Sequence, residues 1–330
     1  MAAKAAKATG GSIVEAAIQI VAGLALLAIG GEGVVRGAVG IARRLGLSEL
    51  LIGLTLVGFG TSTPELMTSV DAALSGSPGI ALGNVLGSNI SNILLILAIV
   101  VLIRPLTVSP AAIGRDGVLV ITVSIALATM AVIFGELNRW IGALLVISLA
   151  LYLFTIWRIE RRGGVGAQAH EAEGHTHDPV PQKLWQSALF AVGGLGLLIL
   201  GADLLVEGAI VTARLAGVSE TVIGLTIVAI GTSLPELVAT LAAAVKGRTD
   251  VAIGSVIGSN LYNILGILGV TALIQPITIP SDIGWIDWGT LIGSACLLLA
   301  FAFTQKRLTR LAGATFLIGY CAYVAFLIAQ

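Results

Sequence analysis

The stretch Gly53-Leu-Thr-Leu-Val-Gly-Phe-Gly-Thr-Ser-Thr-Pro-Glu-Leu-Met-Thr-Ser69 occurs twice in this chain. Its second copy, at an offset of 171 in the numbering, reads Gly224-Leu-Thr-Ile-Val-Ala-Ile-Gly-Thr-Ser-Leu-Pro-Glu-Leu-Val-Ala-Thr240 and is identical at 10 of 17 positions. Each copy places one carboxylate, Glu65 or Glu236, inside an apolar run. A duplicated, proline-broken apolar helix that carries an acid is typical of a cation site in the middle of a membrane.

A second block repeats at the same offset. Gly83-Asn-Val-Leu-Gly-Ser-Asn-Ile-Ser-Asn-Ile-Leu94 returns as Gly254-Ser-Val-Ile-Gly-Ser-Asn-Leu-Tyr-Asn-Ile-Leu265, identical at 8 of 12 positions. The constant spacing indicates that a whole unit of the chain was duplicated, rather than a single short motif.

The composition requires a membrane. Hydrophobic residues make up 57% of the 330 residues, charged residues 11%, and the mean hydropathy is +1.02. A soluble domain cannot bury that much apolar surface. Ten runs are long enough to span a bilayer, at about 20 residues each. They are residues 13–35, 51–74, 79–103, 117–135, 139–157, 184–207, 222–245, 251–274, 285–304 and 309–329. The first is predicted to be a retained helix, because no small-residue cleavage site ends it.

These runs predict an all-α polytopic membrane protein with ten transmembrane helices, arranged as two inverted five-helix repeats. Because five is odd, the second repeat enters the membrane upside down relative to the first. We expect residues 1–159 to form the first repeat, with its motif at 53–94. Residues 160–183 form a linker, and residues 184–330 form the second repeat, with its motif at 224–265.

The distribution of positive charge predicts the orientation. Fourteen Lys and Arg residues fall in one set of loops and four in the other. The positive-inside rule then places both termini outside and the 160–183 connection in the cytoplasm of a plasma or inner cell membrane.

The connection carries all three histidines of the chain, His170, His175 and His177, beside acidic residues. A regulatory metal site is one interpretation. A solvated linker is the interpretation we favour, because nothing in this Gly- and Pro-containing segment would fix a coordination geometry.

The prolines of the motif are predicted to free backbone carbonyls. Pro64 cannot donate a hydrogen bond to the carbonyl of Gly60, and Pro235 likewise cannot donate one to the carbonyl of Gly231. In lipid such carbonyls need a polar partner, and a bound cation can be that partner. Candidate ligands share helix faces at spacings of three to four residues. They are Gly58, Thr61, Ser62 and Glu65; Ala229, Thr232, Ser233 and Glu236; Ser88 and Asn92; Ser259 and Asn263.

All these groups present oxygen. Ca²⁺ prefers six to eight such ligands, and Na⁺ can use subsets of the same set. The absence of histidine and thiolate from the set argues against zinc, copper or iron. Competition of Ca²⁺ and Na⁺ for one set of ligands is a physical basis for exchange. The expected partners are therefore the lipid bilayer and these ions. The sequence gives no sign of a cofactor, a nucleic acid, a required protein partner or a nucleotide, since no Gly-Lys-Ser/Thr comes after the glycine-rich blocks.

Some of these features also have a purely structural interpretation. A single buried glutamate can be protonated and merely structural, but two at equivalent positions after prolines favour a site. Asn89 and Asn260 lie one position off the Ser/Asn face and are interpreted as interhelical hydrogen-bond residues.

The paired signatures resemble those of the Ca²⁺/cation antiporter superfamily, and its prokaryotic Na⁺/Ca²⁺ exchanger branch above all. Gly60-Thr-Ser-Thr-Pro-Glu65 and Gly231-Thr-Ser-Leu-Pro-Glu236 match the two alpha repeats of that family, and the Gly87–Asn92 and Gly258–Asn263 blocks match the next part of each repeat. The resemblance implies a transporter rather than an enzyme. It also implies alternating access, in which the first and sixth helices slide as a gating pair.

The resemblance also implies roles for the candidate residues. Glu65 and Glu236 would be the main Ca²⁺ carboxylates. The Ca²⁺ and Na⁺ positions would be completed by Thr61, Thr232, Ser88, Ser259 and the Gly58 and Ala229 carbonyls. Four further residues would surround them: Ser62, Ser233, Asn92 and Asn263. One position departs from the best-studied exchangers of the family, which have Asp where this chain has Asn263; this leaves stoichiometry and the participation of K⁺ open.

Other functions stay open at this point. A Ca²⁺/H⁺ or K⁺-dependent antiporter is the nearest rival, since a buried carboxylate can also carry a proton. An intramembrane hydrolase using the two glutamates as an acid/base pair and a passive cation channel are rivals of other classes. The sequence suggests no substrate groove for the hydrolase. Channels usually gain symmetry by oligomerising rather than from an inverted repeat in one chain.

Overall fold

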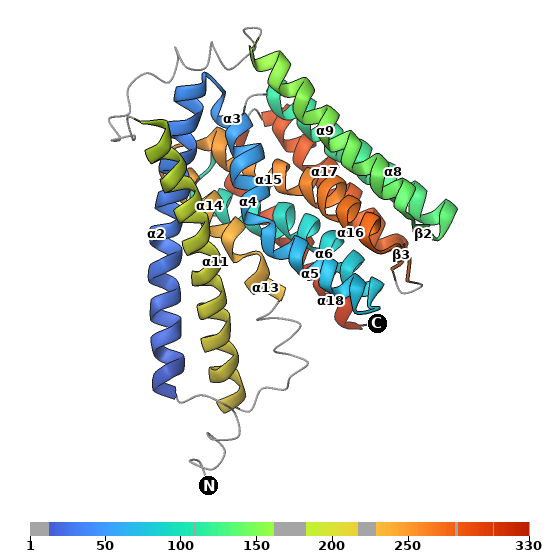
Figure 1. The fold of residues 1–330 in the computed structure, drawn as a ribbon, viewed down its shortest axis with the longest axis horizontal. Helices are drawn as coiled ribbons and strands as arrows, with labels where there is room; N and C mark the ends of the chain where they lie inside the picture. Colours follow the sequence, from blue (N-terminus) through green and yellow to red (C-terminus); the bar gives the residue numbers. More distant parts are fainter. Residues whose placement is uncertain are drawn as a thin grey trace.

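The structure is a computed structural model that describes residues 13–108, 110–161, 183–216, 229–280, 283–305 and 307–329. In these ranges the chain is helical except for short turns and four two-residue strands (Figure 1). The first half contains α2 (Ile13–Leu45), α3 (Glu49–Ile52), η1 (Gly53–Val57), α4 (Gly58–Thr61), α5 (Thr63–Leu74), α6 (Pro78–Ser91), η2 (Asn92–Leu97), α7 (Ala98–Ile103), β1 (Leu106–Thr107), α8 (Pro110–Phe134), β2 (Glu136–Leu137) and α9 (Arg139–Arg161). The elements labelled η are π-helical turns.

The second half repeats this order. It contains α11 (Leu184–Leu215), α13 (Ala229–Thr232), α14 (Leu234–Val245), α15 (Thr249–Leu261), η4 (Tyr262–Ile267), α16 (Leu268–Ile274), β3 (Ile277–Thr278), α17 (Trp285–Gln305), β4 (Arg307–Leu308) and α18 (Arg310–Ala329). Strands β3 and β4 stand at the same offset of 171 from β1 and β2, so the spacing of the sequence motif persists to the last helices.

The helices largely match the predicted spans. Eight helices of the described residues are long and apolar enough to cross a membrane, and a bent pair at 49–74 makes a ninth. The tenth predicted span, 222–245, lies partly outside the described residues, which cover it only from α13 onward. The first helix is longer than the predicted span and ends at Leu45 instead of residue 35. Arg36 lies inside the helix and pairs with Glu32 one turn earlier.

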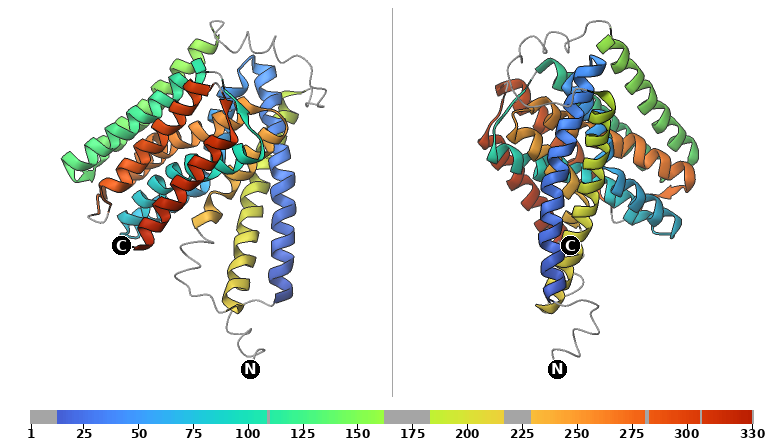
Figure 2. Two further views of the ribbon diagram at one scale, coloured as in Figure 1. Left: turned by 180° about the vertical axis from the view of Figure 1, so that it is seen from behind. Right: turned by 60° about the vertical axis from the view of Figure 1, so that its left-hand side comes forward.

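Helices α2 and α11 stand side by side as a long antiparallel pair (Figures 1 and 2). Glycines at seven-residue intervals let their backbones touch. A Cβ atom on Gly30 would lie 2.8 Å from the Gly194 carbonyl oxygen, and one on Gly23 would lie 2.7 Å from that of Gly201. In a bilayer, where apolar side chains gain nothing by leaving lipid, such close contact of small residues is what holds helices together.

The helices of the second repeated block are the innermost. The span 249–274 is buried along 94% of its most apolar stretch and the span 78–103 along 72%, whereas α18 is buried along only 17%. Gly254 and Gly258 make this possible, since a Cβ on Gly258 would lie 2.0 Å from the Leu54 carbonyl oxygen. The polar motif residues therefore lie at the centre of the protein.

Reciprocal contacts join the two halves at their edges. Strand β1 pairs with β4, and β2 pairs with β3, both antiparallel.

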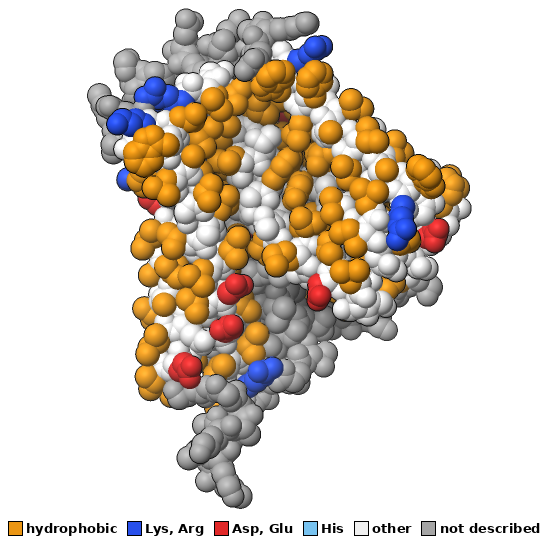
Figure 3. All heavy atoms as spheres, viewed as in Figure 1, with side chains coloured by type: hydrophobic (Ala, Val, Ile, Leu, Met, Phe, Trp, Pro, Cys, Tyr) orange, Lys and Arg blue, Asp and Glu red, His pale blue; other side chains and the backbone are white. Residues whose placement is uncertain are grey.

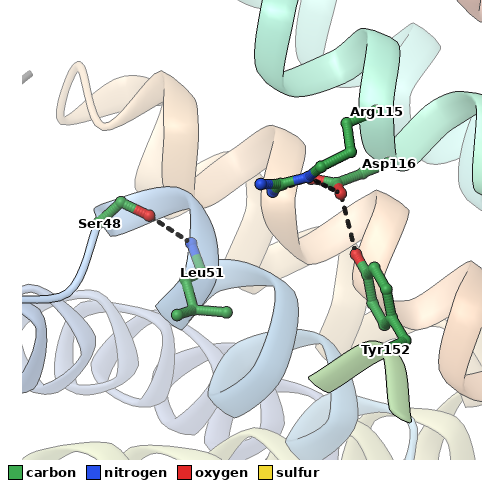
Figure 4. A network of polar contacts seen from close by, with 5 residues as sticks. All are labelled: Ser48, Leu51, Arg115, Asp116 and Tyr152. Carbon is green, nitrogen blue, oxygen red and sulfur yellow. Dashed lines mark hydrogen bonds and ion pairs between the residues drawn. The ribbon is translucent and has the colours of Figure 1, made fainter. Parts of the chain in front are cut away.

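Asp116 of α8 accepts a hydrogen bond from Tyr152 of α9 at 3.1 Å, with Arg115 beside it (Figure 4). Asp287 of α17 accepts one from Tyr323 of α18 at 2.8 Å, and both partners again stand at the offset of 171. The two halves therefore share this Tyr–Asp contact.

The surface agrees with a membrane setting. On the face drawn in Figure 3, hydrophobic side chains cover the middle of the protein, and Lys and Arg gather mainly towards its upper end. Large exposed side chains such as Ile18, Val132, Trp140 and Trp285 lie on this kind of surface. The protein is a polytopic membrane protein.

Candidate ion-binding site

Each acidic motif breaks its helix just before the glutamate. Helix α4 ends at Thr61 and α5 begins at Thr63, with a bend of 45° between α3–α4 and α5. The expectation of one unbroken helix through Gly58, Thr61, Ser62 and Glu65 is therefore wrong. Pro64 stands in the first turn of α5, where its missing N–H is no loss, and the chain turns at Ser62 instead of continuing the helix.

The break places each glutamate at a helix N-terminus. Glu65 lies in the first turn of α5, and Glu236 lies in the first turn of α14, which begins after the matching break at Ser233. Unpaired N–H groups and the helix dipole make this end of a helix favourable for negative charge. The proline thus sets both the backbone break and the electrostatic setting of the acid.

The two carboxylates lie close together in the interior. The Glu65 side chain is 1% exposed and that of Glu236 is 3% exposed, and the two are near enough for a charge on one to act on the other. The Ser62 hydroxyl donates to Glu236 Oε1 at 2.9 Å, which links the first motif to the acid of the second. Among the described residues, Oε2 of each glutamate has no hydrogen-bond partner. Two buried carboxylates with free oxygens are stable only when a cation compensates their charge or a proton neutralises it.

Hydroxyl and carbonyl oxygens adjoin the carboxylates. Thr61 is fully buried beside Glu236 and donates to the Val57 carbonyl at 3.0 Å. The Ser259 hydroxyl donates to the Gly58 carbonyl at 3.0 Å. Only glycine allows this approach, since a Cβ on Gly58 would lie 2.8 Å from the Ser259 amide nitrogen. The predicted ligands Gly58, Thr61 and Ser259 are therefore brought together across the repeats.

Amides connect the two innermost helices. The Asn92 side chain donates to Asn260 Oδ1 at 3.0 Å, and Asn260 donates to the Asn89 carbonyl at 3.3 Å. The interpretation of Asn260 as an interhelical hydrogen-bond residue is thus confirmed. The Asn89 side chain donates instead within its own helix, to the Val85 carbonyl. Asn263 is 1% exposed, and neither polar atom of its side-chain amide has a partner among the described residues.

The other predicted site residues occupy equivalent positions. Ser88 on α6 and Ser233 at the second break are each 7% exposed. Thr232 ends α13 and is half-buried, and Ala229 begins α13 at the edge of the described residues. Both π-helical turns η2 and η4 begin at or next to the site asparagines, Asn92 and Asn263. A π turn re-aims side chains within a helix and is frequent at functional sites.

Four polar residues one helical turn beyond the site were not predicted from the sequence. They are Ser69 and Asn84 in the first repeat, and Thr240 and Ser255 at the same places in the second. Asn84 and Ser255 extend the Ser/Asn faces at a spacing of four, so the signal that found Ser88 and Asn92 also indicates them. All but Asn84 are fully buried.

The donor set suits hard cations. Carboxylate, hydroxyl, amide and backbone oxygens are ligands of Ca²⁺ and similar ions. No group of three or more His, Cys, Asp or Glu side chains that would suit a softer metal occurs in the described part of the chain. The histidines of the linker, at 170, 175 and 177, lie outside the described residues.

Comparison with known proteins agrees with this chemistry. The family of sodium/calcium exchanger proteins matches residues 15–158 and 186–329, which are the two halves of the chain. The "Putative antiporter CaxA" of Alkalimonas amylolytica is 37% identical over 316 residues, covering 93% of this chain and 97% of the relative. The "Sodium/calcium exchanger MaX1" of Methanosarcina acetivorans is 31% identical over 336 residues, covering 92% of this chain and 96% of the relative.

The fold is also that of a solved exchanger. A structure of the sodium–calcium exchanger NCX_Mj superposes with a TM-score of 0.81 at 31% sequence identity, covering 96% of this chain and 100% of the other. The similarity thus extends over both repeated motifs and the broken helices that carry them.

Proposed function

This chain belongs to the family of sodium/calcium exchanger proteins and is a membrane transporter of the cation/Ca²⁺ antiporter class; from this premise we propose that it exchanges Ca²⁺ for Na⁺ by alternating access. The ions bind midway through the membrane, at the interface of the two repeats. Glu65 and Glu236 are the principal Ca²⁺ ligands. The oxygens of the neighbouring hydroxyls, amides and carbonyls complete the Ca²⁺ and Na⁺ positions.

The pair of buried carboxylates is the main support for this proposal. The two acids come from different halves of the chain and are almost completely buried. Ser62, three residues before Glu65, donates a hydrogen bond to Glu236. An unpaired buried charge is very costly, so a cation between the two carboxylates would stabilise the charged form of the site. Ca²⁺ neutralises both charges at once, whereas Na⁺ must do so with more than one ion. Occupation by one kind of ion therefore excludes the other.

We infer an inverted arrangement of the two repeats in ten spans. Reciprocal pairing of β1 with β4 and of β2 with β3 is the pattern that a two-fold axis between equivalent units gives, and it supports this inference. In Figure 1, α4 and α5 run downwards whereas α13 and α14 run upwards, which is also what inversion requires. The charge bias of the loops supports termini outside and a cytoplasmic connection.

Single cysteines test this topology. In a chain whose Cys296 and Cys321 are replaced by serine, we expect Glu160→Cys to react with an impermeant thiol reagent from the cytoplasmic side. Asp282→Cys is expected to react only from the outside. Reaction of both from one side would contradict the five-plus-five arrangement.

Helices α2 and α11 are the proposed moving pair. Their seam is made of glycine backbone contacts, which hold α2 and α11 together as one unit. A unit of this kind can shift against the core as a rigid body. One ionic contact ties the pair to the core, because Lys246 at the end of α14 pairs with Glu32 of α2. We propose that movement of the pair exposes the site to one side and then to the other.

Flux in reconstituted vesicles tests the function. We expect an imposed Na⁺ gradient to drive Ca²⁺ in the opposite direction and against its own gradient, with protein-free vesicles as the control. A channel can only let Ca²⁺ run down its gradient. Replacing the Na⁺ gradient in turn by K⁺ and H⁺ gradients identifies the counter-ion. Ca²⁺ movement driven by H⁺ alone would replace the Na⁺ proposal with a Ca²⁺/H⁺ antiporter.

A further inference from the structure

In the first repeat, the side-chain amide of an asparagine makes two hydrogen bonds next to the ion site. Asn84 of α6 donates its amide N–H groups to the Ser69 hydroxyl at 2.9 Å and to the main-chain carbonyl of Glu65 at 3.1 Å. The amide nitrogen, a positively polarised group, therefore fills a place between two oxygens, one helical turn from the Glu65 carboxylate.

The second repeat lacks this amide. Thr240 and Ser255 replace Ser69 and Asn84 at the offset of 171, on helices α14 and α15, which pack together as α5 and α6 do. Thr240 is 0% exposed and Ser255 is 1% exposed. Within the described ranges, neither hydroxyl has a hydrogen-bond partner. Serine is shorter than asparagine and has no group that reaches the place of the Asn84 nitrogen.

The equivalent place in the second repeat therefore has the hydroxyl oxygens of Thr240 and Ser255 but no amide nitrogen. Two buried hydroxyls without partners are costly, so an occupant that is attracted to oxygen lone pairs would stabilise this place. It also lies one turn from Glu236, whose Oε2 has no partner in the described part of the chain. The negative potential of that carboxylate favours a cation over a neutral occupant.

We propose that Thr240, Ser255 and the Glu236 main-chain carbonyl form an additional Na⁺ site, adjoining the main site on the side where α14 and α15 meet at Lys246–Arg248. Water completes the coordination shell of the ion. Ca²⁺ does not bind there, because it requires more oxygens and charged ones, which this place does not offer. The site rests on the proposed function in one respect only, which is that Na⁺ is a transported ion.

The first repeat has no such site, because the Asn84 amide already fills the place. The additional site is therefore present in the second repeat alone. It gives Na⁺ a binding step that Ca²⁺ lacks, located between Glu236 and the α14–α15 end of the protein. It also distinguishes residues that affect Na⁺ from those that affect both ions.

Thermal unfolding of the purified full-length chain tests the site without any transport. The slope of Tm against the logarithm of ion concentration grows with the number of ions that the folded protein binds. We would measure it for Na⁺ without Ca²⁺, and for Ca²⁺ without Na⁺, at constant ionic strength with an organic cation. The variants are Thr240→Val, which removes the hydroxyl at nearly constant volume, and Ser255→Asn, which installs the amide of the first repeat.

We expect both variants to reduce the Na⁺ slope by about the share of one ion, and to leave the Ca²⁺ slope unchanged. Thr240→Ser keeps a hydroxyl and should retain the wild-type Na⁺ slope. The matched control is Ser69→Ala, which removes the equivalent hydroxyl where the amide is present, and should lower Tm without changing the Na⁺ slope.

Three results would overturn the proposal. The first is an unchanged Na⁺ slope in Thr240→Val and Ser255→Asn, which would mean that the place holds only water. The second is an equal fall of the Na⁺ and Ca²⁺ slopes, and the third is a fall as large in Ser69→Ala. If one of the two main variants does not fold, the other with Ser255→Ala gives the same comparison. A wild-type chain that binds Na⁺ in this assay but shows no Na⁺-driven Ca²⁺ flux would contradict the proposed function and leave the site standing.

Discussion

The two repeats of this protein carry almost the same motif, yet their polar groups are paired differently. Asn92 donates to Asn260, whereas the identical residue Asn263 has no partner in the described part of the chain. Asn84 is bonded to Ser69, whereas Thr240 and Ser255 at the equivalent places are unpaired there. The first difference arises between identical residues and so comes from packing. The second arises from the sequence.

This asymmetry between the repeats bears on transport. If inverted repeats exchange conformations during a cycle, they must differ in any single state, because a fully symmetric protein would be open or closed on both sides at once. Identical residues with different partners, such as Asn92 and Asn263, then report the state. Non-identical ones, such as Asn84 and Ser255, are permanent differences between the two sides.

The largest expected effect tests whether the repeats are equal at their acids. Glu65→Gln and Glu236→Gln should each reduce Ca²⁺ flux about a hundred-fold or more, because each removes half the negative charge that binds Ca²⁺. Flux into vesicles at equal amounts of folded protein is the measurement. Asp203→Asn, on the exposed face of α11, is the matched control and should behave like the wild type. Near-normal flux in either glutamine variant would remove that acid from the site.

The next effect distinguishes the two serines at the helix breaks. Ser62 donates to Glu236, whereas no bond of this kind joins Ser233 to Glu65 among the described residues. A hydrogen bond to a charged group is worth about 1.5–3 kcal/mol. Ser62→Ala should therefore raise the Ca²⁺ concentration for half-maximal flux about ten-fold, and Ser233→Ala should raise it less. Equal shifts would mean that this asymmetry does not matter for ion binding.

A smaller effect concerns the unpaired asparagine. Asn263→Asp adds a third acid to the site, and repulsion between carboxylates should make one of them hold a proton more strongly. Protons then compete with Ca²⁺, so flux should fall more steeply on acidification than in the wild type. Flux from about pH 6 to about pH 9 measures this, because burial and a like charge move the titration of a carboxyl group upwards by several pH units.

Asn92→Asp is the comparison within the other repeat. It also removes the donor to Asn260 and should therefore lower thermal stability, which Asn263→Asp does not do by this route. Parallel pH profiles of a well-folded Asn263→Asp variant and the wild type would place Asn263 outside the ion site.

The smallest effect is expected from the connection between the repeats. Deletion of residues 163–179 should leave basal Ca²⁺ flux within about two-fold of the wild type, because the sequence predicts a linker there that provides no ligands. The two halves remain joined by the α2–α11 seam and the paired strands. A deleted chain that inserts into the membrane and loses all flux would refute the linker interpretation and revive a regulatory role for the histidines.

Prediction from sequence is strongest where a residue type has one physical meaning. The repeat, the membrane setting, the helical class and the family are available from spacing, hydropathy and the Pro-Glu motif. The geometry of residues 58–65 is not, because helical periodicity assumes an unbroken helix and the helix is broken at Ser62. The two pairs of strands also escape prediction, since two residues carry too weak a pattern.

The sequence by itself determined that two acids lie in apolar helices at equivalent places, because hydropathy, proline and the offset of 171 are properties of the chain alone. Only the tertiary structure decided that Ser62 meets Glu236, that Asn92 meets Asn260, and that Asn263, Thr240 and Ser255 meet no partner in the described residues. Those contacts join residues more than 160 positions apart. They depend on how closely glycine-lined backbones approach, and a one-dimensional pattern does not contain that distance.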